Sequence, residues 1–319
     1  MTLPVAPVNT STPLHIETPL IASSAMAGPT GRQVWLKMEA LQPPGSFKIR
    51  GVGFACQTYV QRGAKRFISS SGGNAGIAAA YAGRRLQVPV LVVVPETTTE
   101  RARELIRREQ GDIIVHGASF QEANAHALEL VGPSDAFIHP FDDALLWEGH
   151  ATMIDEVARA GVTPDAVVLS VGGGGLLCGV VEGLRRNGWG HVPIMAVETA
   201  GADSLAQAIA AGERVTLPAI TSIATSLGAR QVSAQAFALS QQGAATSAVT
   251  SVVVSDQAAV QACLRFMDDQ RVVVEPACGA ALALVYADAP QLAGFKNVLV
   301  IVCGGVTATV AQLQKWAAQ

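Results

Sequence analysis

The chain is poor in charged residues, in aromatic residues and in clustered cysteines, and each shortage argues against a class of protein. Charged residues make up 15% of its 319 residues, and the dispersed charges sum to −3, so no basic stripe predicts nucleic-acid binding. Aromatic residues make up 5%, which is too few for surfaces that stack bases. The five cysteines are widely spaced, without a CxxC pair or the spacing of metal ligands, and they favour reduced thiols in the cytoplasm.

Long apolar runs are scarce too, although half of the residues are hydrophobic and the mean hydropathy is +0.33. The longest apolar stretch, 166–181, contains Ser170 and four consecutive glycines and stops at Glu182, so it is poorly suited to spanning a bilayer. The N-terminus lacks a charged segment followed by an apolar run, so no secretory signal is expected. Parallel strands buried between helices explain the composition better than a membrane protein does, and no membrane partner is expected.

Apolar runs of strand length alternate with helical segments along most of the chain. Strands are expected at 34–38, 66–69, 88–94, 113–115, 137–138, 166–171, 193–197, 252–254 and 297–302. This alternation predicts an α/β protein with two open, mainly parallel, twisted sheets flanked by helices. We expect a large domain formed by 1–38 and 146–319, and a small domain formed by 39–145.

Some local signals predict where regular structure begins. The first 30 or so residues are rich in proline, serine and threonine and predict an irregular arm. Thr97 and Glu100 have the spacing of a capping box, and Asp256 is a candidate N-cap of a later helix. A closing helix is expected over 307–317.

Lys48 is the first candidate functional residue. It lies in the run PPGSFKIRG (43–51), after a tight turn and close to the start of an expected helix. Partial desolvation of a lysine lowers its pKa and frees a nucleophilic amine, whose usual product is a Schiff base with a carbonyl compound. Most lysines are solvated surface charges, so Lys48 alone does not decide the matter.

Three loops that follow expected strands could hold one ligand, because parallel sheets bind ligands at the carboxyl ends of their strands. The loop SSSGGNAG (69–76) offers hydroxyls, an amide and helix-start N–H groups to a carboxylate, although a simple N-cap explains it equally well. The four glycines at 172–175 can aim successive N–H groups at a phosphate, whereas a packing turn would need one glycine. Cys303, before a glycine pair, either fills the core or presents its sulfur to a ring nitrogen.

Together with Lys48, these loops make the chain resemble the fold-type II pyridoxal-phosphate enzymes, whose fold is that of the tryptophan synthase β subunit. The resemblance is closest to the L-serine/L-threonine dehydratases (ammonia-lyases), in particular their short serine dehydratase branch. It covers nearly the whole chain and rests on seven motifs in the family's order. These are SFKIRG, SGGNAG, PFDDALLWEGH, SVGGGGLLCGV, ETAGADS, VEPACGAALA and IVCGG.

The resemblance implies an enzyme that eliminates water from L-serine and L-threonine to give pyruvate or 2-oxobutanoate and ammonia. Lys48 would carry pyridoxal phosphate as an imine and then act as the base. Asn74 would contact the pyridine 3-hydroxyl, and Cys303 would face the pyridine nitrogen. The implied cofactor-binding residues are Lys48, Phe47, Asn74, Gly172, Gly173, Gly174, Gly175, Leu176 and Cys303. The implied substrate-binding residues are Ser71, Gly72, Asn74 and Ala75.

The family also implies a monovalent cation, often potassium, and a homodimer. The candidate cation ligands are Gly172, Glu198, Ala202, Leu227 and Ala229. At one position the chain departs from the family, because the most active short serine dehydratases have alanine where Gly72 stands. The missing side chain predicts looser substrate positioning, and so a slower rate or an altered preference between serine and threonine. The C-terminal regulatory domain of the biosynthetic threonine deaminases is absent from the sequence, so isoleucine feedback through it is not expected.

Other readings remain open at this point. A β-replacement enzyme or a serine racemase would share the fold, although Ala75 stands where eukaryotic serine racemases usually have histidine. A non-catalytic nucleotide-binding or amino-acid-binding module would explain the glycine loops but not the lysine in SFKIRG. A nicotinamide dehydrogenase is disfavoured, because no GxGxxG with the downstream acid is present.

Overall fold

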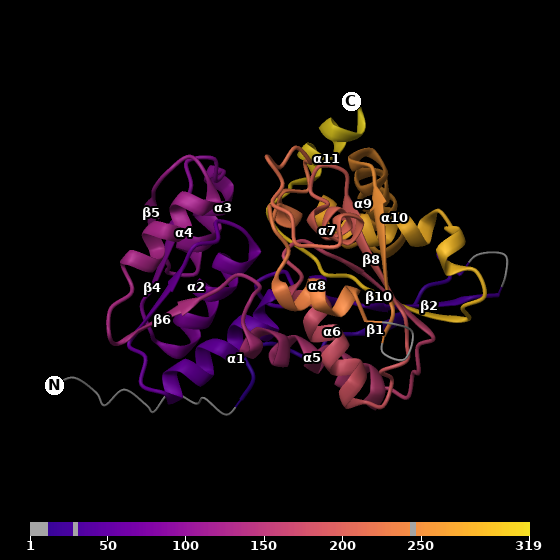
Figure 1. Ribbon diagram of the computed structural model, residues 1–319, viewed down its shortest axis with the longest axis horizontal. Coiled ribbons are helices and arrows are strands. Elements are labelled where there is room, and N and C mark those ends of the chain that lie inside the picture. Colours follow the sequence, from indigo (N-terminus) through magenta and orange to yellow (C-terminus); the bar gives the residue numbers. More distant parts are fainter. Residues whose placement is uncertain (1–11, 28–30, 243–246) are drawn as a thin grey trace. The chain divides into compact units, whose positions relative to one another are not determined.

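The computed structural model describes residues 12–27, 31–242 and 247–319, and the chain divides into two compact units (Figure 1). Among the described residues, unit 1 consists of 12–16 and Lys48–Pro140. Unit 2 consists of the described parts of Glu17–Phe47 and Phe141–Gln319. The peptide bond between Phe47 and Lys48 is therefore one of the points at which the chain passes from one unit to the other.

Unit 1 is built on a four-stranded parallel sheet with the order β5-β4-β3-β6. The central strands are apolar and buried, as expected when helices cover a parallel sheet, and the side chains of Val92, Val93 and Val94 have no exposed surface. The strands are β3 (Arg66–Ser69), β4 (Val90–Val94), β5 (Asp112–Val115) and β6 (Asp135–Ile138). The helices are α1 (Lys48–Gln61), α2 (Asn74–Leu86), α3 (Glu100–Arg108) and α4 (Phe120–Glu129).

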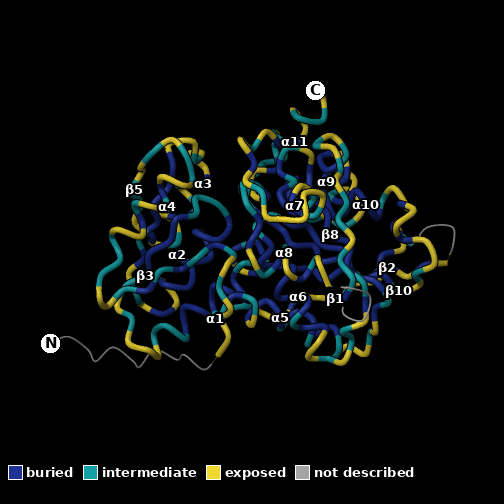
Figure 2. The backbone as a smooth tube through the Cα atoms, in the orientation of Figure 1, coloured by how far each residue is buried: buried dark blue, intermediate teal, exposed yellow. Residues whose placement is uncertain are grey.

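Unit 2 is built on a six-stranded sheet with the order β1-β2-β10-β7-β8-β9, in which only the β1–β2 pair is antiparallel. Figure 2 shows its central strands buried. Every residue of β7 and β8 is buried, which explains their nearly unbroken apolar sequences. The strands are β1 (Leu20–Ala22), β2 (Gln33–Lys37), β7 (Ala166–Ser170), β8 (Ile194–Thr199), β9 (Val249–Val254) and β10 (Asn297–Ile301).

The helices of unit 2 pack on this sheet and on one another, with α5 against α6 and α9 against α10. They are α5 (Ala144–Arg159), α6 (Gly175–Arg186), α7 (Ser204–Ala211), α8 (Ala234–Ser240), α9 (Asp256–Gln270), α10 (Pro276–Tyr286) and α11 (Val310–Ala317). Short 3₁₀ turns occur at η1 (Glu39–Leu41), η2 (Thr225–Leu227) and η3 (Pro290–Leu292). The predicted fold class, two mainly parallel sheets flanked by helices, is confirmed. In the described ranges, no helix combines the length and the apolar character needed to cross a membrane.

The unit boundaries differ from the predicted domains, 1–38 with 146–319 and 39–145. Residues 39–47 belong to unit 2, because η1 continues directly from β2 and because Ser46 forms a β-bridge with Gly304. Residues 12–16 belong to unit 1, where the carbonyl of Thr12 accepts a hydrogen bond from Gln57 and Leu14 packs on Gly53.

Several local predictions were wrong. The expected N-terminal arm contains β1, a three-residue strand that pairs with β2, while the residues before 12 lie outside the described ranges. Helix α3 is capped by Thr99 rather than through Thr97, because a turn from Pro95 to Thr98 precedes it. Ser255, not Asp256, caps α9. The closing helix begins at Val310, three residues late, where Thr309 and Gln312 form a capping box, and α8 was not predicted.

Candidate active site

The sequence-predicted site residues fall into one group in each unit. Lys48, Ser71, Gly72, Asn74 and Ala75 belong to unit 1, at or after the carboxyl ends of its strands or at helix starts. The remaining candidates belong to unit 2, where they follow β7, β8 and β10 or lie in the segment after α7. These are Gly172, Gly173, Gly174, Gly175, Leu176, Ala202, Leu227, Ala229 and Cys303, to which Glu198 within β8 and Phe47 directly before α1 are added.

Lys48 differs from the other lysines in its surroundings. It is half-buried as the first residue of α1, and its Nζ donates a hydrogen bond of 2.7 Å to the carbonyl of Pro140. The first turn of α1 contains no acidic residue, and the positive end of a helix dipole disfavours an ammonium group there. Lys37, by contrast, is buried in an ion pair with Glu156. The other three lysines of the chain, Lys65, Lys296 and Lys315, are exposed.

The loop after β3 folds back onto the start of α2. A side chain at Gly76 would collide with the carbonyl of Ser71, so the close approach of loop and helix requires glycine there. Asn74 and Ala75 are buried at the start of α2, while Ser71 and Gly72 are half-buried. Among the described residues, the backbone N–H groups of Ala75 and Gly76 have no acceptor. These N–H groups at a helix start can bind a carboxylate.

The glycine loop after β7 is held by packing on every side. A side chain at Gly173 or Gly175 would overlap Phe141, and one at Gly172 would approach the main chain of Leu227 to 2.9 Å. A side chain at Gly174 would lie 2.3 Å from the Cβ of Ala236. Packing therefore requires all four glycines, and the prediction that one glycine would satisfy a packing turn was wrong.

The backbone N–H groups of this loop nevertheless indicate an anion-binding site. No residue in the described ranges accepts a hydrogen bond from the backbone N–H groups of 172–176. Gly174, Gly175 and Leu176 are buried, and a buried N–H group without an acceptor is costly. The carbonyl of Gly173 accepts a hydrogen bond of 3.1 Å from the N–H of Ser233, the N-cap of α8. These contacts hold open a row of donors at the start of α6, as a phosphate site requires.

Cys303 lies two residues beyond β10 and is 7% exposed. Its carbonyl accepts a hydrogen bond of 3.1 Å from the N–H of Phe47, the residue before Lys48. The ring of Phe47 lies 4.8 Å from that of His150 on α5, measured between centroids. Gly304 and Gly305 have φ values of +86° and +112°, which side chains rarely adopt. The end of β10 thus fixes the segment that leads into Lys48.

The candidate cation ligands lie after β7, at the end of β8 and just beyond it, and around η2. Glu198 is fully buried in β8, and its two carboxylate oxygens accept hydrogen bonds of 2.8 Å from the N–H groups of Leu205 and Ala206 on α7. Burial raises the pKa of Glu198 to about 7, and these hydrogen bonds act in the opposite direction. The N–H of Ala202 donates a hydrogen bond to the carbonyl of Thr199 in a tight turn. Within the described ranges, no group of three or more His, Cys, Asp or Glu side chains could hold a metal.

A match to the family model of pyridoxal-phosphate dependent enzymes extends over residues 11–304, which is most of the chain and includes all of these loops. The chain belongs to the pyridoxal-phosphate-dependent enzyme family. The resemblance inferred from the seven motifs is thereby confirmed, and so is the prediction that the chain is an enzyme.

The chain is similar to family members of two kinds. It is 47% identical to the human protein named L-serine dehydratase/L-threonine deaminase, over 95% of this chain and 94% of that protein. Its structure superposes on an L-serine ammonia-lyase from Rhizomucor miehei with a TM-score of 0.89 and 35% identity, covering 96% and 99% of the two chains. Maize serine racemase is also similar, with a TM-score of 0.84, 26% identity and 95% and 92% coverage.

The residues present fit pyridoxal phosphate. The buried N–H groups of Gly174, Gly175 and Leu176 would receive its phosphate, and any side chain on the four glycines would intrude on the contacts that hold this loop. Lys48 supplies an amine that donates a hydrogen bond to the neutral carbonyl oxygen of Pro140. A phosphate needs such donors, and an imine link needs such an amine.

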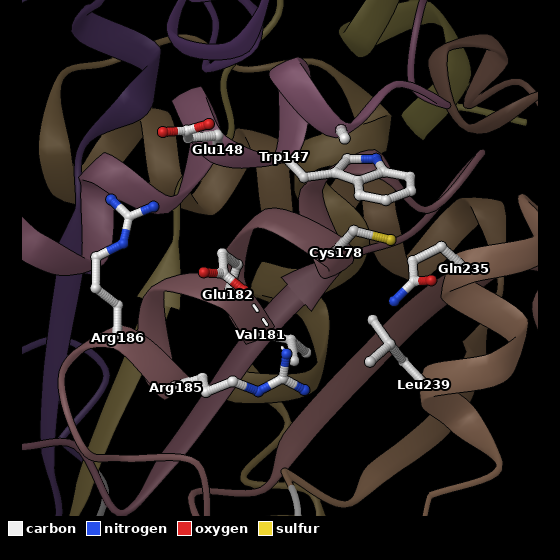
Figure 3. A pocket seen from close by; sticks show the side chains of 10 residues that line it. Trp147, Glu148, Cys178, Val181, Glu182, Arg185, Arg186, Gln235 and Leu239 are labelled. Carbon is white, nitrogen blue, oxygen red and sulfur yellow. Dashed lines mark ion pairs between the residues drawn. The ribbon is translucent and has the colours of Figure 1, made fainter.

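The sequence reasoning assigned no role to two aromatic residues that support the glycine loop. Phe141 covers Gly173 and Gly175, and Trp147 on α5 donates a hydrogen bond of 2.9 Å from Nε1 to the carbonyl of Phe141. Both lie in the motif PFDDALLWEGH, which carried the resemblance without any contact being predicted for it. Figure 3 shows Trp147 beside Cys178 in a pocket of about 360 Å³ on unit 2, lined by α5, α6 and α8.

Proposed function

We propose that this chain catalyses the pyridoxal-phosphate-dependent conversion of L-serine to pyruvate and ammonia, and of L-threonine to 2-oxobutanoate and ammonia. The observation that carries the proposal is the 47% identity, across 95% of the chain, to a protein named for both activities. The geometry supports it with the amine of Lys48 and with backbone N–H groups at 172–176 and at the start of α2 from which no described residue accepts a hydrogen bond.

Each part of the cofactor has a proposed partner. Lys48 would hold its aldehyde carbon, and the N–H groups of 172–176 would hold its phosphate. Phe47 would contact its ring, Asn74 its 3-hydroxyl, and Cys303 its pyridine nitrogen. Ser71, Gly72, Asn74 and Ala75 would receive the substrate carboxylate, and the N–H group of Ala75 is suited to this because none of the described residues accepts a hydrogen bond from it.

Bound there, pyridoxal phosphate supplies a sink for the electron pair that remains when the substrate Cα loses its proton. The Nζ of Lys48 would remove that proton, which requires a neutral amine, and the carbonyl of Pro140 accepts from Nζ without adding a negative charge. The Cβ–O bond then breaks, and the hydroxyl leaves with its electron pair and takes up a proton to form water. Cys303 would place a thiol rather than a carboxylate beside the pyridine nitrogen, and this would favour prompt loss of the hydroxyl. The enamine released afterwards hydrolyses to the keto acid and ammonia.

The alternative functions are those of a serine racemase and of a β-replacement enzyme of the same fold. The structural similarity to maize serine racemase favours the first of these. An assay with L-serine alone separates them. Pyruvate and ammonia in equal amounts, without a second nucleophile, are expected. D-serine without pyruvate would favour racemisation, and no reaction until a thiol is added would favour β-replacement.

We further propose a monovalent cation, such as potassium, held by Glu198 and by main-chain oxygens of Gly172, Ala202, Leu227 and Ala229. The close approach of Gly172 to the main chain of Leu227 supports this grouping. A cation would also stabilise the ionised form of a carboxylate that burial alone would leave largely protonated.

The pH dependence of stability should report on Glu198. Its pKa is about 7 in the folded chain, against an ordinary value of 4.5, so between these values the folded state binds more protons than the unfolded state. Without potassium, the free energy of unfolding should therefore fall by up to roughly 3 kcal/mol between about pH 5 and pH 8. Urea titrations should show a smaller fall with potassium and in Glu198→Gln. If the free energy of unfolding falls equally with pH in the wild type and in Glu198→Gln, a group other than Glu198 causes the fall.

We also propose a homodimer in the cytoplasm. All five cysteines are free and buried, which is consistent with a reducing compartment. Sedimentation at micromolar protein concentration tests the dimer, and a mass of one 33.0 kDa chain would contradict it.

A further inference from the structure

Gly72 has no side chain, and Thr98 fills the space that a side chain would need. A Cβ built on Gly72 would lie 2.5 Å from the Oγ1 of Thr98 and 2.7 Å from its Cγ2. Gly72 is not among the glycines with positive φ, so its backbone would accept an alanine. The obstacle to a side chain at position 72 is therefore Thr98 and not the conformation of the main chain.

The two residues come from neighbouring loops of unit 1. Gly72 follows β3 and Thr98 follows β4, and these strands are adjacent and parallel, with Ser69 paired to Val92. Their loops therefore meet at the carboxyl edge of the sheet, where parallel sheets bind ligands. Thr98 is fixed there, because its N–H donates to the carbonyl of Pro95 at 3.0 Å and the next residue, Thr99, caps α3.

The side chain of Thr98 faces Gly72 with an uncommitted hydroxyl. Thr98 is half-buried, whereas its neighbours Thr97 and Thr99 are exposed. Among the residues that the structure describes, none makes a hydrogen bond to the Oγ1 of Thr98. Both branches of this side chain approach Gly72, so its orientation is set by packing rather than by a polar contact inside the protein.

We propose that Thr98 is a specificity-determining residue that sets the room for the β-substituent of the amino-acid substrate. The inference rests on the proposed function, in which the loop 71–75 receives the substrate. The side chain of Thr98 occupies the space that an alanine methyl group at position 72 would need. L-Threonine carries a methyl group on its β-carbon and L-serine does not, so the volume of residue 98 decides how well the larger substrate fits.

A set of matched variants tests this assignment. Thr98→Ala should raise kcat/KM for L-threonine relative to L-serine about tenfold, the effect expected for the room of one or two methyl groups. Thr98→Val keeps the shape and removes the hydroxyl, so the ratio should stay within about twofold of the wild type if packing sets the preference. Thr97→Ala, at the exposed neighbouring residue, is the control and should leave both rates unchanged.

The contact between Gly72 and Thr98 can also be tested through the stability of the folded protein, without an activity assay. Gly72→Ala should destabilise the folded chain, because Thr98 must move, and Thr98→Ala should relieve that loss in the double variant. Urea unfolding of the two single variants and the double variant measures this coupling. Additive losses would show that the two side chains do not share one space, and they would overturn the inference.

Different results would refute the proposed function and the role of Thr98. A wild-type protein that releases no keto acid from either amino acid would refute the proposed function, and this inference with it. An active wild type whose threonine-to-serine ratio does not change in Thr98→Ala would overturn the role of Thr98 alone. A ratio that changes equally in Thr97→Ala would also overturn it, because the effect would then not be specific to the residue beside Gly72.

Discussion

Lys48→Ala is expected to abolish release of keto acid and to remove the visible absorbance that lysine-bound pyridoxal phosphate gives. The reason lies in what surrounds each lysine. Lys37 is held in an ion pair with Glu156, three lysines are exposed, and Lys48 is half-buried with its Nζ on a neutral carbonyl. Losing both the attachment point and the base should lower kcat by at least about 10⁴-fold. Stopped assays of pyruvate and an absorbance scan of the purified protein measure the two effects.

Two matched variants make this result specific. Lys65→Ala removes an exposed lysine from the same unit and should leave both the absorbance and kcat unchanged. Lys48→Arg keeps a cation at the start of α1 but cannot form the imine or lose a proton near neutral pH, so it should resemble Lys48→Ala. A Lys48→Ala protein that still carries a borohydride-reducible link to the cofactor would show that another lysine bears it.

Much of the fold could be predicted because the strands are buried on both faces. β4, between Pro89 and Pro95, is wholly apolar, and β7 and β10 are apolar apart from one terminal residue each; such runs mark the interior strands of parallel sheets. β1 was missed because it has three residues, two of them exposed, and forms only by pairing with β2. Such an element depends on a tertiary contact that its own sequence does not announce.

The helix caps could be predicted from the sequence only to within a few residues. Thr97 and Glu100 have the correct spacing for a capping box, but the turn from Pro95 takes up Thr97 and moves the cap to Thr99. The carboxylate of Asp256 instead accepts hydrogen bonds from Ser222 and from the N–H of Ile223, and Ser255 caps α9. Spacing identifies candidate caps, but contacts with other loops decide among neighbours.

The loops of the candidate site could be predicted from the sequence, but the residues that pack against these loops could not. Strand ends followed by glycines identified 69–76, 172–175 and Cys303, because ligand-binding loops of parallel sheets have this pattern. The number of glycines was a poor argument for a phosphate, since Phe141, Leu227 and Ala236 account for all four. The better evidence for a phosphate is that the N–H groups of 172–176 have no acceptor in the part of the chain that the structure describes, which the sequence does not reveal. Thr98 could not be predicted, because its contact with Gly72 joins loops of two different strands.

Gly174→Ala is expected to weaken the binding of pyridoxal phosphate by about ten- to a hundredfold. Gly174 has a φ of +92°, and its new methyl group would lie 2.3 Å from the Cβ of Ala236. Relief of that overlap must move the loop, and with it the N–H groups of Gly175 and Leu176 that begin α6. Each hydrogen bond to a charged phosphate is worth about 1.5–3 kcal/mol, so misplacing one or two is enough for this loss. Titration of cofactor-free protein with pyridoxal phosphate, followed by absorbance, gives the dissociation constant.

Gly188→Ala is the matched control for this effect, because it lies just beyond the other end of α6. Its φ is +76°, and nothing lies within 4 Å of the position that its methyl group would take. Both variants therefore carry a similar backbone strain, of about 1 kcal/mol, and only Gly174→Ala also carries the overlap. Urea unfolding should show the strain in both proteins, whereas the cofactor affinity should fall in Gly174→Ala alone. Equal affinities in the two variants would mean that the N–H groups after β7 do not bind the phosphate, and the anion site would have to be sought at the start of α2.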